Sequence, residues 1–369
     1  MNDLRLAIAF VSACSRLRVS NRERAHLLRE AGGLDLILRY LEGQADHAGG
    51  QGPQVLALAI RQALLHIQGQ SFPHSWQALS LDDPTYPSRL LQIKSPPAIL
   101  FVSGQDFDCL NQAFVLALIG SRRPSVYGIE VTRALAGELA GREIPLVSGG
   151  ARGIDALVHR TALEKNGPTV AVLANGLDRP YPPEHKRLFT EIEARGALVT
   201  EFTPGTAAQR GHFPARNRIL AGLCDAVLVT EASESSGTLI TAGFAGDFGR
   251  DVLAVPGSIL SGRSRSCHSL IKDGAGLIET VDDIPGLPAS VSRSRLQAAI
   301  PGTTEVSGPD GLILSLLANR PRTLADLGAA TGLDRQTLAY RMALLRKDGL
   351  VDLDRGLYSV SGPAGPAVF

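Results

Sequence analysis

The chain has 369 residues, of which 44% are hydrophobic and 20% are charged, an ordinary balance for a protein with a sizeable buried core. This composition excludes a collagenous, a disordered or a disulfide-stapled chain, and the length suggests two or three domains. The net charge is +1, with 8 Lys and Arg against 6 Asp and Glu in residues 1–80, 22 against 23 in 81–300 and 7 against 7 in 301–369. A site for a polyanion must therefore be a local cluster of basic residues and not a whole basic domain.

The cysteines and histidines do not form the spacings that metal sites use. Cys14, Cys109, Cys224 and Cys267 lie far apart without a CxxC pair, and the eight histidines supply no HxxxH pair, so we expect no metal. We expect reduced, buried thiols in a cytoplasmic protein. The apolar stretch at the N-terminus is short for a membrane span and lacks the order of a signal peptide.

Residues 1–75 are predicted to form a small helical (SAM-like) domain. Apolar residues recur at helical spacing in 4–13, 22–43 and 55–67, and glycine-rich stretches near 32–33 and 49–53 interrupt them. Some small helical domains bind the DNA backbone through a glycine-containing hairpin. No Gly-hydrophobic-Gly hairpin stands out in this segment, so we favour a packing or interaction module.

Residues 80–285 alternate between apolar, β-branched runs and helical stretches. Strands are predicted at 113–120, 144–150, 168–176, 196–202, 225–232 and 250–257. Helices are predicted near 127–140, 153–165, 183–195, 214–223 and 238–248. The strands are apolar almost throughout, as strands covered on both faces of a parallel sheet must be. The alternation predicts an α/β fold with a doubly wound, mostly parallel sheet.

The last part of the chain has a different composition. Residues 286–308 are rich in Pro, Gly and Ser and are predicted to form a linker. Residues 309–369 show three short helical stretches followed by a hairpin that turns at 354–356. This order predicts a C-terminal winged-helix domain.

Five loops that follow predicted strands or begin predicted helices carry polar or basic residues. Because ligands of open α/β sheets bind outside the carboxyl ends of the strands, we consider these loops together as one candidate site. The first loop consists of Gly120, Ser121, Arg122 and Arg123. Its glycine lets the backbone approach a ligand, and its hydroxyl and guanidinium groups can bind phosphate. The alternative is a turn with solvated arginines.

The second loop contains Gly149, Gly150 and Arg152 and leads into a predicted helix. Consecutive glycines at a helix start expose backbone N–H groups beside the positive end of the helix dipole, which suits an anion. Asp155 argues partly against a phosphate there, because it can cap the helix itself. We predict that Asp155 forms a structural pair with His159, one turn further on.

Two more clusters lie at the starts of predicted helices. Lys186 and Phe189 lie one turn apart on one helix face, and a cation with an aromatic ring is what single-stranded nucleic acid requires. The alternative is that Phe189 belongs to the core. The next cluster, Arg216, Asn217 and Arg218, is a dense set of hydrogen-bond donors that a solvated helix face rarely needs.

The fifth loop is the Gly/Ser-rich segment 231–238, with Gly237 near its end. It offers backbone donors and hydroxyl groups before another helix. Together the five loops predict a site for a phosphate-rich ligand. The chain has no nucleophile elbow, Walker A lysine motif or metal-ligand spacing, so we predict binding without catalytic residues or a cofactor.

Several longer motifs occur in a fixed order in this chain. They are YPxxL from Tyr86, PPxxLF from Pro96, IGSR from Ile119, SGGARGIDALVH from Ser148, VLANGLDRPYP from Val172, FPARNR from Phe213, SGTLITAGFA from Ser236 and VPG from Val255. This combination resembles the DNA-processing protein A (DprA/Smf) family. The resemblance covers about Asp82 to Thr280, over half of the chain, and the helical start and winged-helix end match the three-part arrangement of some members.

The resemblance implies an extended Rossmann fold that binds single-stranded DNA and is not an enzyme. It implies protection of incoming DNA and loading of RecA recombinase during natural transformation, by a homodimer. A single-strand-binding protein is a further candidate partner. Carried over by motif, the DNA pocket is the loop of Gly120, Ser121 and Arg122. The further candidates for DNA contacts are Lys186, Phe189, Arg216 and Arg218.

Two functions from other classes remain as alternatives. The glycine-rich loops also resemble those of lysine-decarboxylase-like nucleoside-monophosphate phosphoribohydrolases, but SESSGTLITA at 233–242 lacks the double glycine and the Glu of their PGGxGTxxE motif. The second alternative is a winged-helix transcription regulator. The predicted helix 335–347 holds four basic residues, yet the tail is neutral as a whole, and a repressor would need more phosphate contacts.

Overall fold

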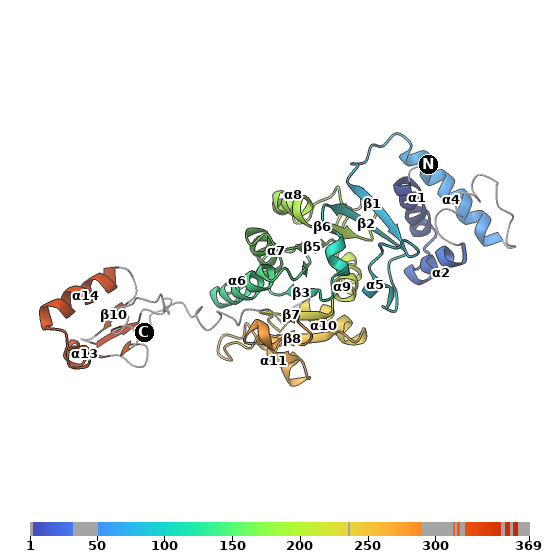
Figure 1. Ribbon diagram of the computed structural model, residues 1–369. Helices are drawn as coiled ribbons and strands as arrows, with labels where there is room; N and C mark the ends of the chain where they lie inside the picture. Colours follow the sequence, from blue (N-terminus) through green and yellow to red (C-terminus); the bar gives the residue numbers. More distant parts are fainter. Residues whose placement is uncertain are drawn as a thin grey trace. The chain divides into compact units, whose positions relative to one another are not determined.

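A computed structural model describes residues 3–31, 51–234, 237–288, 322–347, 351–354 and 357–360, together with 313, 316 and 317 (Figure 1). The chain divides into two compact units, residues 1–292 and 293–369, and each is considered by itself. Among the described residues, none of the helices combines the length and the apolar composition that a bilayer span requires.

The first unit is built on a nine-stranded sheet in the order β1-β2-β6-β5-β4-β3-β7-β8-β9. The strands are β1 (Trp76–Ser80), β2 (Ile99–Gly104), β3 (Leu116–Ile119), β4 (Leu146–Ser148), β5 (Thr169–Val172), β6 (Ala197–Thr200), β7 (Ala226–Val229), β8 (Asp251–Ala254) and β9 (Gly276–Leu277). Strands β3 to β9 pair in parallel, and β2 pairs antiparallel with both β6 and β1.

The doubly wound sheet predicted from the sequence is confirmed. Each of the six predicted strands contains one of the strands β3 to β8, and in β3 to β7 every residue is buried because helices cover both faces. The sequence analysis did not predict β1, β2 or β9. These strands extend the sheet at its two ends. Strands β1 and β9 are less buried than the central strands, so their sequences lack the continuous apolar run from which the central strands were predicted.

The helices lie on both faces of this sheet (Figure 1). They are α5 (Ser88–Leu91), α6 (Val126–Gly141), α7 (Ile154–Glu164), α8 (Lys186–Arg195), α9 (His212–Gly222), α10 (Thr238–Asp247) and α11 (Arg265–Lys272), with short 3-10 turns η1 (Asp108–Asn111), η2 (Pro183–His185) and η3 (Val281–Asp283). Helices α6, α7 and α8 pack in series, whereas α9 packs against α10. The chain runs outward from β3 to β6 and then returns to β7, which places these two sets on opposite faces.

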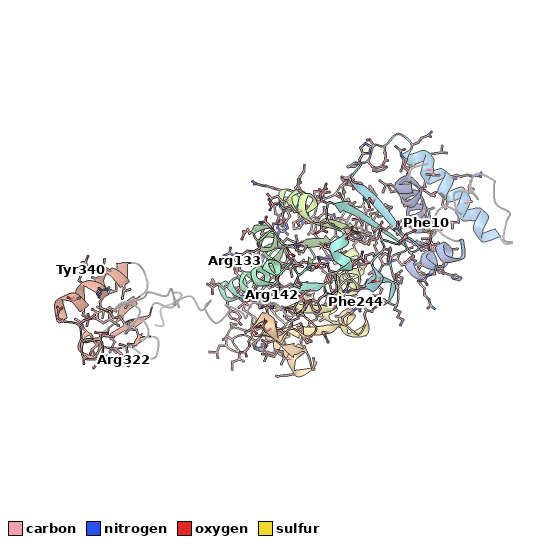
Figure 2. All side chains as sticks on the ribbon, in the orientation of Figure 1. Phe10, Arg133, Arg142, Phe244, Arg322 and Tyr340 are labelled. Atoms are coloured by element: carbon pink, nitrogen blue, oxygen red, sulfur yellow. The ribbon has the colours of Figure 1, made fainter. Side chains whose placement is uncertain are left out.

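The N-terminal helices share the core of the sheet domain. They are α1 (Asp3–Arg16), α2 (Asn21–Ala31) and α4 (Gln51–Ile67), and residues 32–50 lie outside the described residues. Helix α1 packs against α4 and β1, and Phe10 on α1 is fully buried (Figure 2). The buried side chains of these helices belong to the same cluster as those of the sheet. The structure places these helices in the same compact unit as the sheet. A separate domain over residues 1–75 stays a prediction.

The second unit contains α13 (Leu324–Thr331), α14 (Arg335–Lys347), β10 (Val351–Asp354) and β11 (Leu357–Val360). The two strands form an antiparallel hairpin, and Leu327, Leu338, Met342 and Val351 are buried between the hairpin and the helices. Most of the predicted linker lies outside the described residues. The helix-helix-hairpin order agrees with the predicted pattern, and the winged-helix assignment itself stays a prediction.

One partly buried arginine fixes the start of the central strand β3. Arg89 Nε lies 2.8 Å from Asp225 Oδ1, at the start of β7. The same guanidinium donates to the carbonyl oxygens of Leu110, at 3.0 Å, and Gln112, at 2.7 Å. The other Asp225 oxygen accepts the N–H of Val115 at 2.7 Å. This network therefore holds the segment that enters β3, the strand that leads to the Gly120 loop.

We expect the substitution Arg89→Ala to lower the free energy of unfolding by about 3 kcal/mol, because removal of one member of a largely buried pair leaves Asp225 without its countercharge. Urea unfolding followed by circular dichroism measures this change. The control is Arg133→Ala, on the exposed side of α6 (Figure 2), which should change stability by less than about 0.5 kcal/mol. Equal stability of the two variants would contradict the proposed role of Arg89.

Candidate functional site: an arginine-lined cavity between β3 and β7

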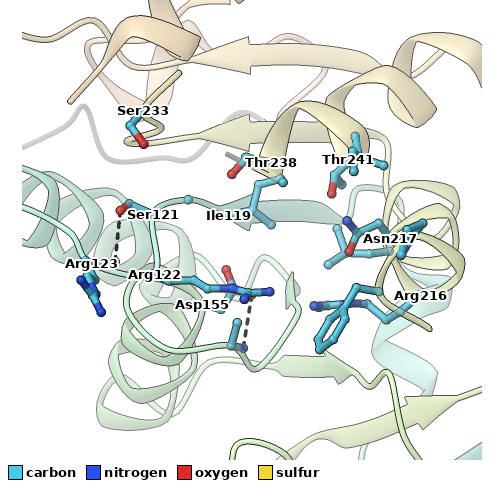
Figure 3. Close-up of a pocket in the computed structure, with 17 residues that line it drawn as sticks. Ile119, Ser121, Arg122, Arg123, Asp155, Arg216, Asn217, Ser233, Thr238 and Thr241 are labelled. Atoms are coloured by element: carbon cyan, nitrogen blue, oxygen red, sulfur yellow. Dashed lines mark hydrogen bonds between the residues drawn. The ribbon is translucent and has the colours of Figure 1, made fainter. Parts of the chain in front are cut away.

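The strand order of the sheet reverses between β3 and β7, so the loops that follow these strands lead to helices on opposite faces. Such a reversal opens a crevice at the carboxyl ends of the strands. A cavity of about 480 Å³ lies there (Figure 3). Its lining comprises Ile119, Gly120, Ser121, Arg122, Arg123, Ala151, Asp155, Phe213, Pro214, Arg216, Asn217, Leu220, Ser233, Gly237, Thr238, Ile240 and Thr241.

The backbone of the Gly120 loop is closely packed, whereas the side chains at its tip are exposed. A Cβ atom at Gly120 would lie 2.7 Å from Ile154 Cγ1 and 3.0 Å from the Glu231 carbonyl oxygen, so only glycine fits. Ser121 N–H donates to that same carbonyl oxygen at 2.7 Å. The side chains of Arg122 and Arg123 are exposed. The rigid backbone therefore presents the Arg122 guanidinium to the cavity, with Arg123 at its edge (Figure 3).

The helix that follows this loop, α6, has acceptors for two N–H groups at its start, those of Ser125 and Gly128. Glu231 is buried, and its carboxylate accepts the N–H and the hydroxyl of Ser125, with 3.0 Å between Oε1 and Ser125 N. Ser125 Oγ in turn accepts the N–H of Gly128 at 3.1 Å. These contacts occupy two N–H groups at the start of α6, and the arginine side chains offer further donors to an anion in the cavity.

A buried arginine and a buried carboxyl group lie at the floor of the cavity. Arg216 on α9 is 5% exposed and Asp155 on α7 is 7% exposed. Burial raises the pKa of the Asp155 carboxyl above its usual value, while the positive charge of Arg216 opposes this effect. Burial lowers the pKa of Arg216, which the Asp155 charge opposes. Among the described residues, Arg216 Nε has no hydrogen-bond partner, and Nη1 donates to the Val172 carbonyl oxygen at 3.3 Å.

The arginines of the loop and of the floor converge. Figure 3 shows the Arg122 and Arg216 side chains pointing toward one another across the cavity, and the charge of Arg122 contributes to the lowered pKa of Arg216. The lining contains three arginines against one carboxylate, that of Asp155. Two like charges that face each other attract an anion between them, so this arrangement can bind a phosphate.

The glycines of the second loop serve close packing. A Cβ atom at Gly149 would lie 1.4 Å from Arg216 Nη1, and one at Gly150, where φ is +64°, would lie 2.7 Å from Phe189 Cε1. The N–H of Ala151 donates to Asp155 Oδ2 at 3.3 Å. The loop therefore leaves space for the Arg216 guanidinium and donates a hydrogen bond to the Asp155 carboxylate. A phosphate contact from Gly149 or Gly150 stays a prediction.

The predicted pair between Asp155 and His159 is wrong, because Asp155 accepts the N–H of Ala151 and His159 bonds to Thr169. His159 is buried, and its Nδ1 lies 2.8 Å from Thr169 Oγ1. Since the Thr169 hydroxyl donates to the Leu146 carbonyl oxygen, it accepts from the ring, so the neutral ring carries its proton on Nδ1. His159 Nε2 has no partner among the described residues, and burial lowers the pKa of the ring to about 3.

Two side chains predicted to contact DNA are buried, and their DNA contacts stay predictions. Phe189 is 3% exposed and belongs to the core, because the apolar side of α8 faces the sheet. Arg218 is 9% exposed, forms an ion pair with Glu201 and donates to the Ser95 carbonyl oxygen at 2.7 Å. Neither side chain lines the cavity. The two arginines of α9 thus have different roles. Arg216 faces the cavity, whereas Arg218 holds the helix to Glu201 and to the Ser95 carbonyl oxygen.

The other predicted site residues divide between the cavity and the surface nearby. Asn217 and Gly237 line the cavity with the Gly120 loop. Arg152 is exposed and forms an ion pair with Glu184, and it lines a smaller adjoining hollow. Lys186 is exposed at the start of α8 and is absent from the lining of either hollow. A DNA contact from Lys186 stays a prediction.

Sequence reasoning missed two aromatic residues beside the arginines. Phe213 precedes the first arginine of α9, and Arg122 Cζ lies 5.4 Å from its ring centroid. Tyr181 approaches the Phe213 ring edge-on, with 6.0 Å between the centroids. The sequence offered one signal for these rings, since each is followed by a proline, Pro182 after Tyr181 and Pro214 after Phe213. A proline is rare within a central strand, so neither ring is expected to belong to the strands of the core.

Known proteins are similar in sequence to the part of the chain that forms this sheet and cavity. The family described as DNA recombination-mediator protein A matches residues 77–286. The DNA processing protein DprA of Streptococcus pneumoniae is 41% identical over 243 residues, which cover 65% of this chain and 84% of that protein. Protein Smf of Synechocystis is 39% identical over 236 residues, 62% of this chain and 59% of that protein. The chain thus spans less than two thirds of the Synechocystis relative.

Two solved structures resemble the chain in fold. The X-ray structure of DNA processing protein A from Streptococcus pneumoniae has a TM-score of 0.62 and 34% identity, and the match covers 77% of this chain and 96% of that chain. The protein of the same name from Helicobacter pylori, described with its single-stranded DNA binding mode, has a TM-score of 0.52 and 29% identity, with 56% and 93% covered.

The close fit of Gly149 against Arg216 leads to a prediction about stability. The substitution Gly149→Ala places a methyl group on the guanidinium and should separate Arg216 from Asp155, which we expect to cost about 3 kcal/mol or more. Gly243→Ala on α10 is the matched control, because a Cβ atom there meets nothing within 4 Å. Alanine should stabilise that helix by up to about 1 kcal/mol. Urea unfolding of both variants tests the contrast, and two changes of the same sign would refute it.

The buried ring of His159 predicts a pH dependence of stability. Its folded pKa of about 3 lies below the unfolded value of about 6.5, so the unfolded chain binds the extra proton between these values. The free energy of unfolding should therefore fall as the pH drops below about 6.5, by up to about 1.4 kcal/mol per pH unit. Urea unfolding at pH 7 and pH 5 measures the slope. His159→Asn, which keeps a donor near Thr169, should reduce that slope; an unchanged slope would assign it to other groups.

Proposed function

Because the chain belongs to the DNA recombination-mediator protein A family, we propose that it binds single-stranded DNA in the cavity between β3 and β7. The observation that carries this proposal is the convergence of Arg122 and Arg216 on one point of the cavity. A phosphate between the two guanidinium groups would relieve their repulsion and accept charge-assisted hydrogen bonds from both. Arg123 adds a third positive charge at the rim.

The shape of the site favours a single strand over a duplex. The arginines lie in a concave crevice at the end of a sheet, with hydroxyl groups of Ser121 and Thr241 and the amide of Asn217 around them. Among the described residues that line this crevice, none belongs to a helix that projects outward as a recognition helix must to enter a major groove. Phosphate contacts with little reading of base edges give affinity without strong sequence preference.

The biological role follows from the family. We propose that the chain acts in DNA processing during natural transformation, where it protects incoming single strands and loads RecA recombinase on them as a homodimer. A non-enzymatic role fits the lining, whose one carboxylate, Asp155, is engaged by Arg216 and the Ala151 N–H. No cluster of three or more His, Cys, Asp or Glu side chains that could hold a metal occurs among the described residues.

Fluorescence anisotropy with labelled oligo-dT and with a duplex of equal length tests the proposal. We expect tighter binding of the single strand, with the logarithm of affinity falling with the logarithm of salt by about 0.7 per neutralised phosphate. Salt-independent, sequence-specific binding of the duplex would instead support a winged-helix regulator. Release of ribose phosphate from nucleoside monophosphates would support the phosphoribohydrolase alternative.

The exposed guanidinium of Arg122 should contribute directly to affinity. We expect Arg122→Ala to weaken binding of oligo-dT by about 1.5–3 kcal/mol, the range for hydrogen bonds to charged groups, and Arg122→Lys to recover part of the loss, because an ammonium cannot fork onto a phosphate. Stability should change by less than about 1 kcal/mol. Anisotropy and thermal melting measure the two effects.

The matched control is Arg133→Ala, an exposed arginine on α6 that does not line the cavity. It should lower affinity much less than Arg122→Ala does. Equal affinities for the two variants would place the DNA elsewhere, and a large fall in melting temperature for Arg122→Ala alone would make Arg122 a structural residue.

A further inference from the structure

The aromatic pair at the wall of the cavity has no role in the hydrophobic core. Tyr181 is 40% exposed and Phe213 is half-buried, and neither ring belongs to the core cluster that contains Phe189. Tyr181 comes from the loop between β5 and η2, whereas Phe213 comes from the first turn of α9. Two loops therefore bring rings together, at 6.0 Å between centroids, on the surface of the site.

The Phe213 ring lies where two hollows meet. Phe213, Arg122 and Arg216 line both the main cavity and the smaller hollow next to it. Tyr181 and Asn175 line only the smaller hollow. A chain of nucleotides that places one phosphate against Arg122 and Arg216 would pass this ring, because consecutive nucleotides are joined through that phosphate.

In the free protein a cation occupies one side of the Phe213 ring. Arg122 Cζ lies 5.4 Å from the ring centroid, which is within the range of a cation–π interaction. Such an interaction at an exposed site is weak, so a phosphate can draw the guanidinium away. The ring face would then be open to the flat, polarisable surface of a nucleobase.

We propose that Phe213, with Tyr181 against its edge, is the base-stacking platform of the site, and that a nucleobase replaces Arg122 on the ring when the guanidinium binds phosphate. The inference rests on the proposed binding of single-stranded DNA and adds to it the contact with the base. It assigns to Phe213 the stacking role that the sequence analysis gave to Phe189. A stacked base of any identity fits, so the platform favours nucleic acid with bases over a bare sugar-phosphate chain.

The test compares two ligands of equal charge, oligo-dT and an oligomer of the same length made of abasic tetrahydrofuran nucleotides. Anisotropy should show that the wild-type chain prefers oligo-dT. The substitution Phe213→Leu should weaken oligo-dT binding by about 5- to 150-fold, the range for loss of one base–aromatic stack, and should change abasic binding much less. Arg122→Ala should weaken binding of both ligands.

The control is Phe248→Leu, which alters another half-buried ring. Phe248 stacks on Phe244 at the far end of α10, about 15 Å along the helix from Thr238 at the cavity. This variant should keep the preference for oligo-dT. In a second experiment, Phe213→Trp should retain binding, and its added fluorescence should be quenched by oligo-dT and not by the abasic oligomer; the wild-type protein, with Trp76 as its only tryptophan, provides the background.

Three results would overturn the inference. An equal loss for both ligands in Phe213→Leu would show that the ring only positions Arg122. An undiminished preference for oligo-dT in Phe213→Leu would assign stacking to another ring. A wild-type chain that binds the two ligands equally has no stacking platform, while its binding would still support the proposed function. If the wild-type chain binds neither ligand, the proposed function fails as well.

Discussion

The buried guanidinium of Arg216 lies where the strand order of the sheet reverses, and the geometry of the whole site depends on keeping it there. A buried cation is costly unless a countercharge and acceptors compensate it. Asp155 on α7 supplies the countercharge, Val172 on β5 supplies a carbonyl oxygen, and Gly149 leaves the space that the guanidinium fills. Three neighbouring segments of the sheet domain are thus fixed around one charge at the floor of the cavity.

Some N–H groups near the cavity have acceptors within the protein, and arginine side chains add donors for a ligand. Ser125 and Glu231 accept the first N–H groups around α6, and Asp155 accepts that of Ala151 before α7. In many α/β proteins such helix N-termini hold phosphate directly. In this chain Arg122, Arg123 and Arg216 line the cavity, so guanidinium groups add positive charge to that of the helix N-termini.

The arginines illustrate why the overall charge conceals the site. Arg89 and Arg218 are bound to Asp225 and Glu201 and act within the fold, so their charges are cancelled locally. Arg122 and Arg123 are exposed at the tip of a loop whose base is rigid. A net charge of +1 is therefore compatible with a strongly positive crevice, because the compensating acids lie at other places in the molecule.

The sequence by itself determined the alternation of strands and helices and the loop of Gly120 to Arg123, because apolar runs, glycines and helical periodicity are local properties of the chain. It also placed Arg122 at a strand end, where the sheet edge gathers ligands. Only the tertiary structure decided that the charge of Asp155 acts on Arg216, that Arg218 forms an ion pair with Glu201, and that Phe213 and not Phe189 faces the cavity. Sequence spacing shows which residues share a helix face, but the elements packed against the helix determine whether that face is buried or open to a ligand.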